Sequence, residues 1–229
     1  MEAITIIVPV KDEEDGLQYL LDDYHKSNLE KRYDIRFIFV IDHRTSDSSK
    51  EYATKFSDNI INQKDTTGKG AAVSQAVSLW KKNPTGMAIF LDADGSYSFD
   101  SVSKIIDELE SGTDVASGSR FLDRKGRPRG MSRLHYFGNR ALSFISSARN
   151  GRKIYDLCTG LWGFRKEALM KLDFNSSGFD LEAEISGLSR RHSLSHQEVR
   201  VEWSQRKGGI SKLRSLTDGL IIFFRIIRT

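Results

Sequence analysis

A nine-residue stretch at positions 87–95, with the sequence MAIFLDADG, constrains the fold of this chain more than any other segment. Its five leading apolar residues have the length and composition of a buried β-strand, and two carboxylates, Asp92 and Asp94, follow at once. Ligands of open α/β sheets bind beyond the carboxyl ends of the strands. The pair therefore offers hard oxygen ligands for Mg²⁺ or Mn²⁺ beside a diphosphate. Alternatively, one aspartate caps the next helix and the other is simply solvated.

Strand-like and helix-like segments alternate along the chain. The runs that predict strands lie at residues 4–10, 35–41, 59–62, 87–91, 114–118, 156–164 and 198–203. The segments that predict helices lie at residues 16–27, 47–56, 68–80, 101–110, 132–148, 179–192 and 213–227. This order predicts an α/β fold with a Rossmann-like sheet, mixed but mainly parallel and flanked by helices. The sequence contains neither the G-x-G-x-x-G motif of dinucleotide folds nor a P-loop.

Composition narrows the class of protein and the kind of partner. With 229 residues, of which 38% are hydrophobic, the chain fits one sizeable domain with or without an appended tail. Its single cysteine, Cys158, excludes a disulfide within the chain and indicates a reducing compartment. Lysine and arginine cluster late in the sequence, which favours anionic partners such as phosphate-bearing molecules or anionic lipid. Nucleic acid is disfavoured, because no stacking aromatic residues are interleaved with the basic ones.

Two of the predicted helices are amphipathic. The apolar face of the helix at 132–148 consists of Leu134, Phe137, Ala141, Leu142 and Ile145. We expect a main domain at residues 1–212 and an amphipathic C-terminal helix at 213–229, which either docks on that domain or lies in a membrane interface. The arginines that flank its apolar residues favour the membrane interface. A membrane-spanning helix needs a run of about 18 or more apolar residues. No window of the sequence contains such a run.

Six short motifs, in order along nearly the whole chain, together resemble one family. They are PVKDE at 9–13, DHRTSD at 42–47, GKG at 68–70, DAD at 92–94, GSRF at 118–121 and R-x-x-G-I-S-K-L at 206–213. In this combination the chain resembles a GT-A glycosyltransferase of family 2. The last motif makes it most similar to the branch of dolichyl-phosphate mannose synthases and polyprenyl-phosphate glycosyltransferases. The resemblance implies a GT-A fold, with residues 1–212 as the catalytic domain.

The resemblance also implies a nucleotide site and a metal site. Asp92 and Asp94 would hold Mg²⁺ or Mn²⁺ on the donor diphosphate. Pro9, Asp12 or Glu13, and Asp42 would line the pocket for base and ribose. The full nucleotide-binding set that it implies is Pro9, Asp12, Glu13, Asp42, Lys69, Asp92 and Ala93.

A second group of residues is implied to surround the acceptor. Arg120 and Arg133 would face phosphates, and Arg206, Ser211 and Lys212 would close over them, with Arg133 and Ser211 on the acceptor phosphate. The catalytic set that the resemblance implies is Asp94, Arg120, Arg206 and Lys212. The acceptor would be a dolichyl or polyprenyl phosphate at the cytoplasmic face of the membrane, where the protein would be peripheral.

The chemistry of such an acceptor sets what the enzyme needs. A phosphate oxygen is already an anion at neutral pH, so its attack on the anomeric carbon, with inversion, requires cations but no general base. A sugar or protein hydroxyl, the alternative acceptor, would need a carboxylate base, for which Asp156, Asp180 and Glu182 are the candidates. Mannose is the first choice of sugar. The family usually has two adjacent acids after the second strand, but here His43 follows Asp42, which leaves GDP- and UDP-linked donors both open.

Overall fold

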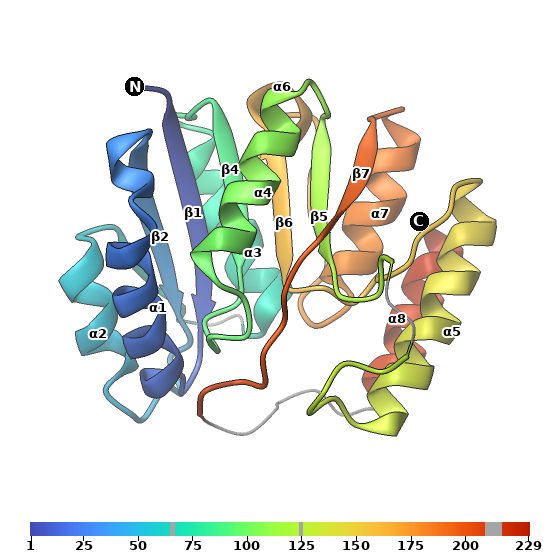
Figure 1. Ribbon diagram of the computed structural model, residues 1–229, viewed down its shortest axis with the longest axis horizontal. Helices are drawn as coiled ribbons and strands as arrows, with labels where there is room; N and C mark the ends of the chain where they lie inside the picture. Colours follow the sequence, from blue (N-terminus) through green and yellow to red (C-terminus); the bar gives the residue numbers. More distant parts are fainter. Residues whose placement is uncertain (65–66, 124–125, 209–216) are drawn as a thin grey trace.

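The computed structural model describes residues 1–64, 67–123, 126–208 and 217–229, and a seven-stranded sheet forms the centre of this part of the chain (Figure 1). The strand order is β3-β2-β1-β4-β6-β5-β7. The strands are β1 (Ala3–Val10), β2 (Asp34–Ile41), β3 (Ile60–Asn62), β4 (Met87–Leu91), β5 (Val115–Ser119), β6 (Leu161–Arg165) and β7 (His196–Arg200). Neighbouring strands are parallel except that β6 runs antiparallel to both β4 and β5.

The strand order places a crevice between β1 and β4. From β1 the chain builds outward through β2 to β3, and it then returns to add β4 on the opposite side of β1. At such a reversal the connections leave in opposite directions, so the carboxyl ends of β1 and β4 border an open site. Gly16 packs against the carbonyl group of Ala93, where a Cβ atom would overlap it. The segments that follow β1 and β4 therefore lie side by side.

Helices cover both faces of the sheet. One face carries α1 (Glu14–Ser27), α2 (Ser49–Phe56) and α4 (Phe99–Glu110), with a short 3₁₀ helix η1 (Leu29–Lys31) after α1. The other carries α3 (Lys69–Trp80), α6 (Lys166–Leu169) and α7 (Leu181–Arg191). A third group, α5 (Arg133–Asn150) and α8 (Thr217–Arg228), packs together beside the sheet, near the β5 and β7 edge (Figure 1).

Helix α8 is held to the domain by one face. Ile222 and Ile226 are buried against residues of α5 and α7. Arg225 adds ion pairs to two carboxylates, 2.7 Å to Asp180 and 3.2 Å to Glu184. Helix α8 therefore docks on the domain through one face, as its amphipathic sequence allows.

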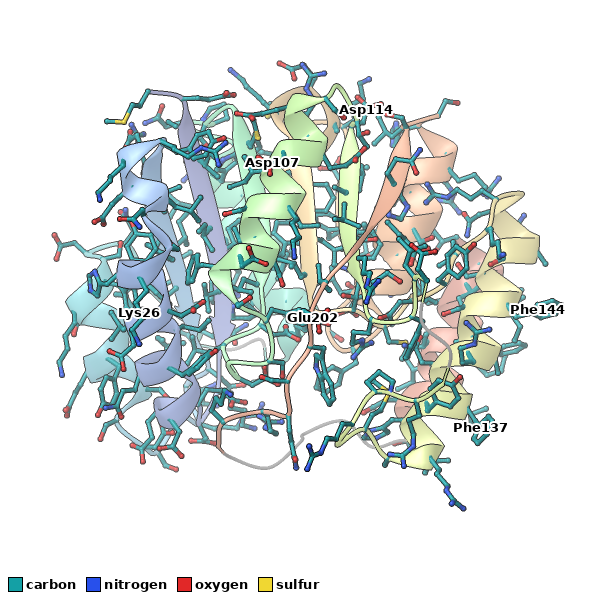
Figure 2. All side chains as sticks on the ribbon, viewed as in Figure 1. Lys26, Asp107, Asp114, Phe137, Phe144 and Glu202 are labelled. Carbon is teal, nitrogen blue, oxygen red and sulfur yellow. The ribbon has the colours of Figure 1, made fainter. Side chains whose placement is uncertain are left out.

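The outer faces of α5 and α8 are apolar and exposed to solvent. Figure 2 shows Phe137 and Phe144 pointing away from the domain, and Phe144 is 75% exposed. This apolar outer face consists of Leu134, Phe137, Phe144, Leu220, Ile221, Phe224 and Ile227. Within the described ranges, none of the helices combines the length and hydropathy that a bilayer crossing requires.

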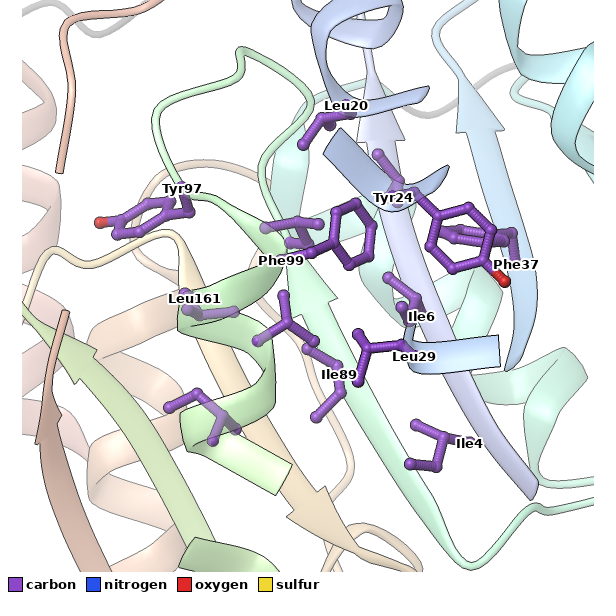
Figure 3. Packing of buried hydrophobic residues seen from close by; sticks show 14 of the residues in the cluster. Ile4, Ile6, Leu20, Tyr24, Leu29, Phe37, Ile89, Tyr97, Phe99 and Leu161 are labelled. Atoms are coloured by element: carbon purple, nitrogen blue, oxygen red, sulfur yellow. The ribbon is translucent and has the colours of Figure 1, made fainter. Parts of the chain in front are cut away.

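The core consists of two apolar layers, one on each face of the sheet. Successive side chains of β1 alternate between them, so that Ile4 and Ile6 pack beneath α1 and α4 while Ile7 packs beneath α3. On the first side Tyr24 meets Phe37 edge to face, with 5.1 Å between ring centroids (Figure 3). Strands buried on both faces read as continuous apolar runs, which is why β1, β2 and β4 are evident in the sequence.

The structure confirms the predicted class of fold and corrects two of its strands. The strand predicted at 156–164 begins only at Leu161, because the preceding N–H groups bond to side chains and not to a neighbouring strand. Leu157 N–H, for example, donates to Ser143 Oγ and Gly160 N–H donates to Tyr97 OH. The strand predicted at 198–203 lies instead at His196–Arg200, and only an isolated bridge joins Trp203 to Tyr97.

Candidate active site

A cavity of about 1120 Å³ opens at the carboxyl ends of the strands. Its walls come from the segments after β1, β2, β4 and β5, from α3, α5, α7 and α8, and from the chain after β7. Most of the residues that the sequence selected lie together on this cavity. They are Pro9, Glu13, Asp42, Lys69, Asp92, Ala93, Asp94, Arg120 and Arg206.

On the cavity wall, Asp92 forms a charged triad with Lys69 and Glu182, of which Glu182 is buried and the other two are half-buried. Lys69 Nζ lies 2.6 Å from Asp92 Oδ1 and 2.6 Å from Glu182 Oε1, so that it links the end of β4 to the start of α7. Burial lowers the pKa of Lys69, but the charges of Asp92 and Glu182 outweigh burial and raise it above its ordinary value. Burial disfavours the charged form of Asp92 as well and raises the pKa of this acid, although the Lys69 charge opposes the rise. A Cβ atom at Gly160 would overlap the Asp92 carboxylate, so a larger residue there would have to displace that carboxylate.

Asp94 differs from Asp92 in having no ion-pair partner among the residues that the structure describes. Its Oδ1 accepts a hydrogen bond of 2.9 Å from Ser96 N–H, and its main-chain carbonyl accepts one from Lys207 N–H. In the part of the chain that the structure describes, no lysine, arginine or histidine nitrogen forms an ion pair with the Asp94 carboxylate. Two hard oxygen donors thus face the cavity, one anchored and one accessible, which suits a Mg²⁺ or Mn²⁺ ion whose remaining ligands are phosphate oxygens and water.

The acid that follows β2 is held by a two-pronged ion pair. Arg44 Nε lies 2.9 Å from Asp42 Oδ1 and Arg44 Nη2 lies 2.7 Å from Asp42 Oδ2. The hydrogen bonds from the Arg44 side chain lower the pKa of Asp42 to about 2. At neutral pH Asp42 therefore presents a charged, oriented carboxylate on the cavity wall.

Replacement of Arg44 by glutamine is expected to raise the pKa of Asp42 toward about 3.9, the ordinary aspartate value. A depressed carboxyl pKa stabilises the folded state above the unfolded pKa, and that contribution disappears as the pH falls from about 4 to about 2. Carbon-13 NMR of the side-chain carboxyl groups would show wild-type Asp42 still ionised near pH 3 and the variant about half protonated near pH 4. Arg36→Gln, which removes the partner of Asp34 on the same strand, is the control. An Asp42 pKa that stays near 2 in the Arg44 variant would contradict this explanation.

The chain that follows β7 crosses the mouth of the cavity. It is tied to the β4 loop by Ser204 N–H, which donates to the Ser96 carbonyl group. Arg206 Nη2 lies 2.6 Å and 2.7 Å from the two carboxylate oxygens of Glu13, at the end of β1. Arg206 is therefore placed over the cavity from the side opposite α5.

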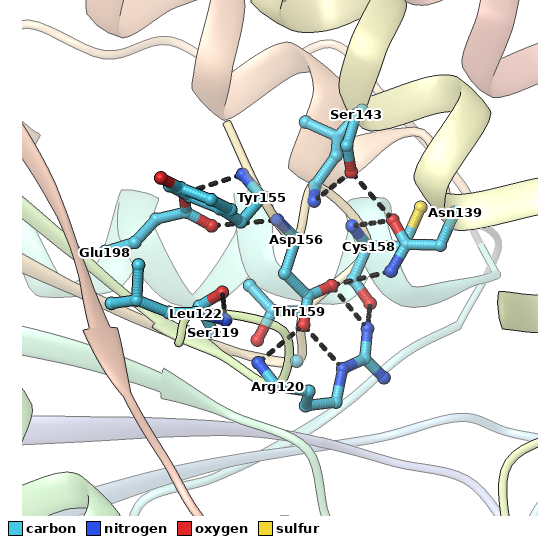
Figure 4. Close-up of polar contacts among 12 residues, drawn as sticks. Ser119, Arg120, Leu122, Asn139, Ser143, Tyr155, Asp156, Cys158, Thr159 and Glu198 are labelled. Atoms are coloured by element: carbon cyan, nitrogen blue, oxygen red, sulfur yellow. Dashed lines mark hydrogen bonds and ion pairs between the residues drawn. The ribbon is translucent and has the colours of Figure 1, made fainter. Parts of the chain in front are cut away.

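Arg120, directly after β5, is the most firmly positioned cation of the cavity (Figure 4). Its Nε and Nη2 each lie 2.7 Å from one oxygen of Asp156, whose side chain is completely buried. Burial lowers the pKa of Arg120, but the charge of Asp156, the interaction with Tyr97 and the hydrogen bonds to Asp156 together outweigh burial and raise the pKa above its ordinary value. Because the edge that binds Asp156 uses Nε and Nη2, the guanidinium is held in one orientation on the cavity wall.

A further set of hydrogen bonds fixes Asp156 itself. Asn139 Nδ2 donates to Asp156 Oδ1 at 2.6 Å, while Asn139 Oδ1 accepts from Cys158 N–H. From the other side, Glu198 accepts the Asp156 N–H at 2.8 Å. The sequence analysis missed Asn139. The sequence does indicate it, because Asn139 and Ser143 are two polar residues one turn apart in the helix predicted at 132–148, which was selected for its apolar face.

All three candidate bases of the alternative reaction are engaged by cations. Asp156 is paired with Arg120, Glu182 with Lys69, and Asp180 with Arg225. In each pair the carboxylate already accepts a hydrogen bond from its cation. The geometry favours a positioning role for these three acids.

Four residues of the predicted nucleotide, metal, catalytic and acceptor-phosphate sets do not line the described cavity. Asp12 lies beside it with a positive φ of 47°, and its Oδ1 accepts the Ser46 N–H at 2.8 Å. Arg133 is exposed at the start of α5 and is not part of the cavity wall. Ser211 and Lys212 lie outside the described residues.

Comparison of the sequence with characterised proteins gives relatives that span the chain. Glycosyltransferase AglJ of Haloferax volcanii is 28% identical over 99% of this chain and 72% of its own length. A dolichyl-phosphate hexose transferase of the same organism is 27% identical over 99% of this chain and 93% of its own. The polyprenol monophosphomannose synthase of Mycolicibacterium smegmatis is 23% identical over 91% of this chain and 80% of its own.

Solved structures resemble the fold. Glucosyl-3-phosphoglycerate synthase of Mycobacterium tuberculosis, in complex with phosphoglyceric acid, matches 99% of this chain and 79% of its own, with a TM-score of 0.76 and 15% identity. The same enzyme in complex with Mn²⁺, UDP and phosphoglyceric acid matches with a TM-score of 0.71 and 14% identity. These matches confirm the predicted GT-A fold. The family model for glycosyl transferase family 2 matches residues 5–173, and the chain therefore belongs to this family of glycosyltransferases.

Proposed function

We propose that the protein transfers a hexose, with mannose as the first choice, from a nucleotide sugar to dolichyl or polyprenyl phosphate, with inversion at the anomeric carbon. One observation carries the proposal. The cavity has carboxylates for a metal diphosphate on one wall and the fixed cation Arg120 on another, and it continues onto apolar residues of α5 and α8. The apolar residues of those two helices that line it are Leu134, Ala141, Leu142, Leu220 and Ile222.

The donor would bind on the β1 and β4 side. Asp42 and Glu13 would face the nucleoside, and Asp92 and Asp94 would hold a divalent cation. These two carboxylates fit such an ion, since hard carboxylate oxygens bind Mg²⁺ or Mn²⁺ together with substrate phosphates. When bound, the ion would supply positive charge to the leaving diphosphate.

The acceptor would bind on the β5 side. Its phosphate would meet Arg120, with Arg206 approaching from the chain after β7, so that two cations offset the repulsion between two anionic substrates. Because the acceptor oxygen is already ionised, the paired states of Asp156, Asp180 and Glu182 present no obstacle. The dolichyl-phosphate hexose transferase of Haloferax and the polyprenol monophosphomannose synthase of Mycolicibacterium, by their names, support this class of acceptor.

The apolar outer face of α5 and α8 would rest on the membrane that contains the lipid acceptor. Seven large apolar side chains exposed on two adjacent helices form the kind of patch that marks an interaction surface. Exposed arginines on the same helices, such as Arg133 and Arg140, suit anionic headgroups. We place the protein as a peripheral enzyme at the cytoplasmic face.

Replacement of Phe137 and Phe144 together by serine is expected to weaken binding to anionic vesicles by roughly tenfold or more, since two large apolar side chains would no longer be buried in lipid. Both side chains are exposed, so thermal unfolding should be nearly unchanged. Vesicle sedimentation measures the binding. Leu79→Ser, at an exposed leucine on α3, is the matched control and should bind as the wild type does. Equal binding by all three proteins would contradict the membrane surface.

The proposed function is tested by a transfer assay with GDP-mannose, UDP-glucose and UDP-N-acetylglucosamine, each with a polyprenyl phosphate and Mg²⁺ or Mn²⁺. We expect sugar in the organic extract with one donor. A soluble glycan acceptor and a dephosphorylated polyprenol serve as controls and should give no product. Transfer to the soluble glycan, with none to the lipid phosphate from any donor, would replace the proposal with the hydroxyl-acceptor reaction.

A further inference from the structure

Three polar side chains of α5 bind the main chain at residues 154–158. They are Asn139, Ser143 and Ser147, which are four positions apart and therefore share one stripe of the helix. Their oxygen atoms accept the N–H groups of Cys158 at 3.2 Å, Leu157 at 2.9 Å and Ile154 at 2.8 Å, respectively. At each of these turns, α5 is attached to the segment by a hydrogen bond.

Asn139 also reaches the carboxylate of Asp156. Oδ1 of Asp156 accepts Asn139 Nδ2 at 2.6 Å and Arg120 Nη2 at 2.7 Å, and Oδ2 accepts the main-chain N–H of Arg120 at 2.9 Å and its Nε at 2.7 Å. A carboxylate has about four lone-pair sites, so these bonds occupy them all and hold the group in one orientation. Removal of the Asn139 amide would open one of the four.

The segment at residues 156–158 in turn holds the guanidinium of Arg120. Nε and Nη2 bind Asp156, and Nη2 also donates to the Cys158 carbonyl group at 2.5 Å. Arg120 lines the active-site cavity, and among the residues that the structure describes its Nη1 forms no hydrogen bond. This amino group is therefore the part of Arg120 that is left for a phosphate oxygen.

We propose that Asn139 is a positioning residue, which orients Arg120 toward the acceptor phosphate through Asp156. This role rests on the proposed function, in which Arg120 meets that phosphate. In a planar ion pair, rotation of the carboxylate turns the guanidinium with it, so an amide that fixes Asp156 also fixes the direction of Arg120 Nη1. Asn139 thus joins α5, whose outer face would rest on the membrane, to the cation that would receive the lipid phosphate.

The first test compares Asn139→Leu with the matched control Ser147→Ala. Both variants remove hydrogen bonds between α5 and the same segment, so each should lower the Tm by about 2–4 °C. Asn139→Leu should also lower kcat/KM for polyprenyl phosphate by about 10- to 100-fold, because the cation is misplaced. The KM for the nucleotide sugar should not change, and Ser147→Ala should transfer as wild type does. Transfer that is unchanged in Asn139→Leu, or reduced equally in both variants, would overturn the positioning role.

Asn139→Asp provides a readout that a merely structural role would not move. The variant keeps an oxygen for the Cys158 N–H, but it places a second carboxyl group against Asp156. Two adjacent carboxyl groups share a proton at a raised apparent pKa, so the introduced group donates to Asp156 only when it is protonated. The ratio of variant to wild-type kcat/KM should therefore rise as the pH falls from about 8 to about 5, whereas the ratio for Asn139→Leu should stay flat. A flat ratio for Asn139→Asp would contradict the role.

The other titratable groups near Asp156 do not obscure this readout. Burial raises the pKa values of Tyr97 and Cys158 to about 12, so both stay neutral in this range. The pKa of Arg120 is raised above its ordinary value, so Arg120 stays charged. Glu198 and the acceptor phosphate are common to variant and wild type, and their titration cancels in the ratio.

The orientation of Arg120 is also measured without catalysis. In ¹⁵N–¹H NMR spectra the Arg120 Nε–H group, which Asp156 accepts, should exchange with water slowly in wild type and Ser147→Ala and roughly tenfold faster in Asn139→Leu. If wild type transfers no sugar to a lipid phosphate, the proposed function fails, and the exchange rates still decide whether Asn139 orients Arg120. If wild type does transfer and the three exchange rates are equal, only the role of Asn139 fails.

Discussion

Asp94→Asn is expected to lower the rate of sugar transfer by roughly two to three orders of magnitude. Asparagine keeps the shape of the side chain and the oxygen that accepts the Ser96 N–H at 2.9 Å, so the turn after β4 is preserved. What disappears is a negative charge that, unlike the charge of Asp92, is not committed to a lysine in the described structure. The variant would hold a divalent cation and its diphosphate less well, and the leaving group would gain less stabilisation.

Two measurements separate this effect from a loss of folding. Electron paramagnetic resonance of Mn²⁺ in the presence of a nucleoside diphosphate reports metal binding without catalysis, and it should weaken in Asp94→Asn. Removal of metal from the wild type with a chelator should reproduce the low transfer rate of the variant. Asp100→Asn, at an exposed acid of α4 that pairs with Lys104, is the control and should behave as wild type. Unchanged Mn²⁺ binding in Asp94→Asn would remove this acid from the metal site.

The central strands could be predicted because burial on both faces leaves a plain signal. Strands β1, β2 and β4 are runs of apolar residues that end in acids or a turn, and parallel pairing brings those ends to one edge. The edge strand β7 has no such signal, since its sequence HQEVR is mostly polar and partly exposed. Its predicted bounds were wrong for that reason.

Most of the residues that line the cavity could be predicted from the sequence, but the ion pairs among them could not. The strand ends bring Asp92 and Arg120 to the cavity. The sequence does not show, however, that Lys69 lies between Asp92 and Glu182, since Glu182 is 113 positions after Lys69 in the chain. Such pairs depend on the contact between the start of α3 and the segment before α7, where Gly70 N–H donates to the Gly178 carbonyl group, and on the direction of each side chain. The acids that seemed available as bases in the sequence therefore turn out to be engaged.

Helix α5 shows how an amphipathic pattern can mislead. Its predicted apolar face included Leu134 and Phe137, yet these side chains are exposed, while Asn139, Ser143 and Ser146 are buried. The buried face is small and polar because it binds the backbone at 156–158 through hydrogen bonds. An apolar stripe on a helix identifies a face that avoids water, and it does not identify what covers that face.

Arg120→Met is expected to lower transfer by roughly two to three orders of magnitude while nucleotide binding is retained. The same variant should also lose about 3–5 kcal/mol of unfolding free energy, because Asp156 would remain buried without its cation. Urea unfolding measures the stability, and the transfer assay measures the activity. A transfer rate within a few-fold of wild type would exclude Arg120 from the acceptor phosphate.

The double variant Arg120→Met, Asp156→Asn separates the two effects. Removing both charges eliminates the unpaired carboxylate, so most of the lost unfolding free energy should return, as expected when both members of a buried pair are replaced. Transfer should not return, because the cation that meets the acceptor phosphate is still missing. A double variant that regains transfer would mean that Arg120 serves only to neutralise Asp156. A stable and inactive double variant would mean that the fold requires the pair only to be balanced, while the reaction requires its positive member.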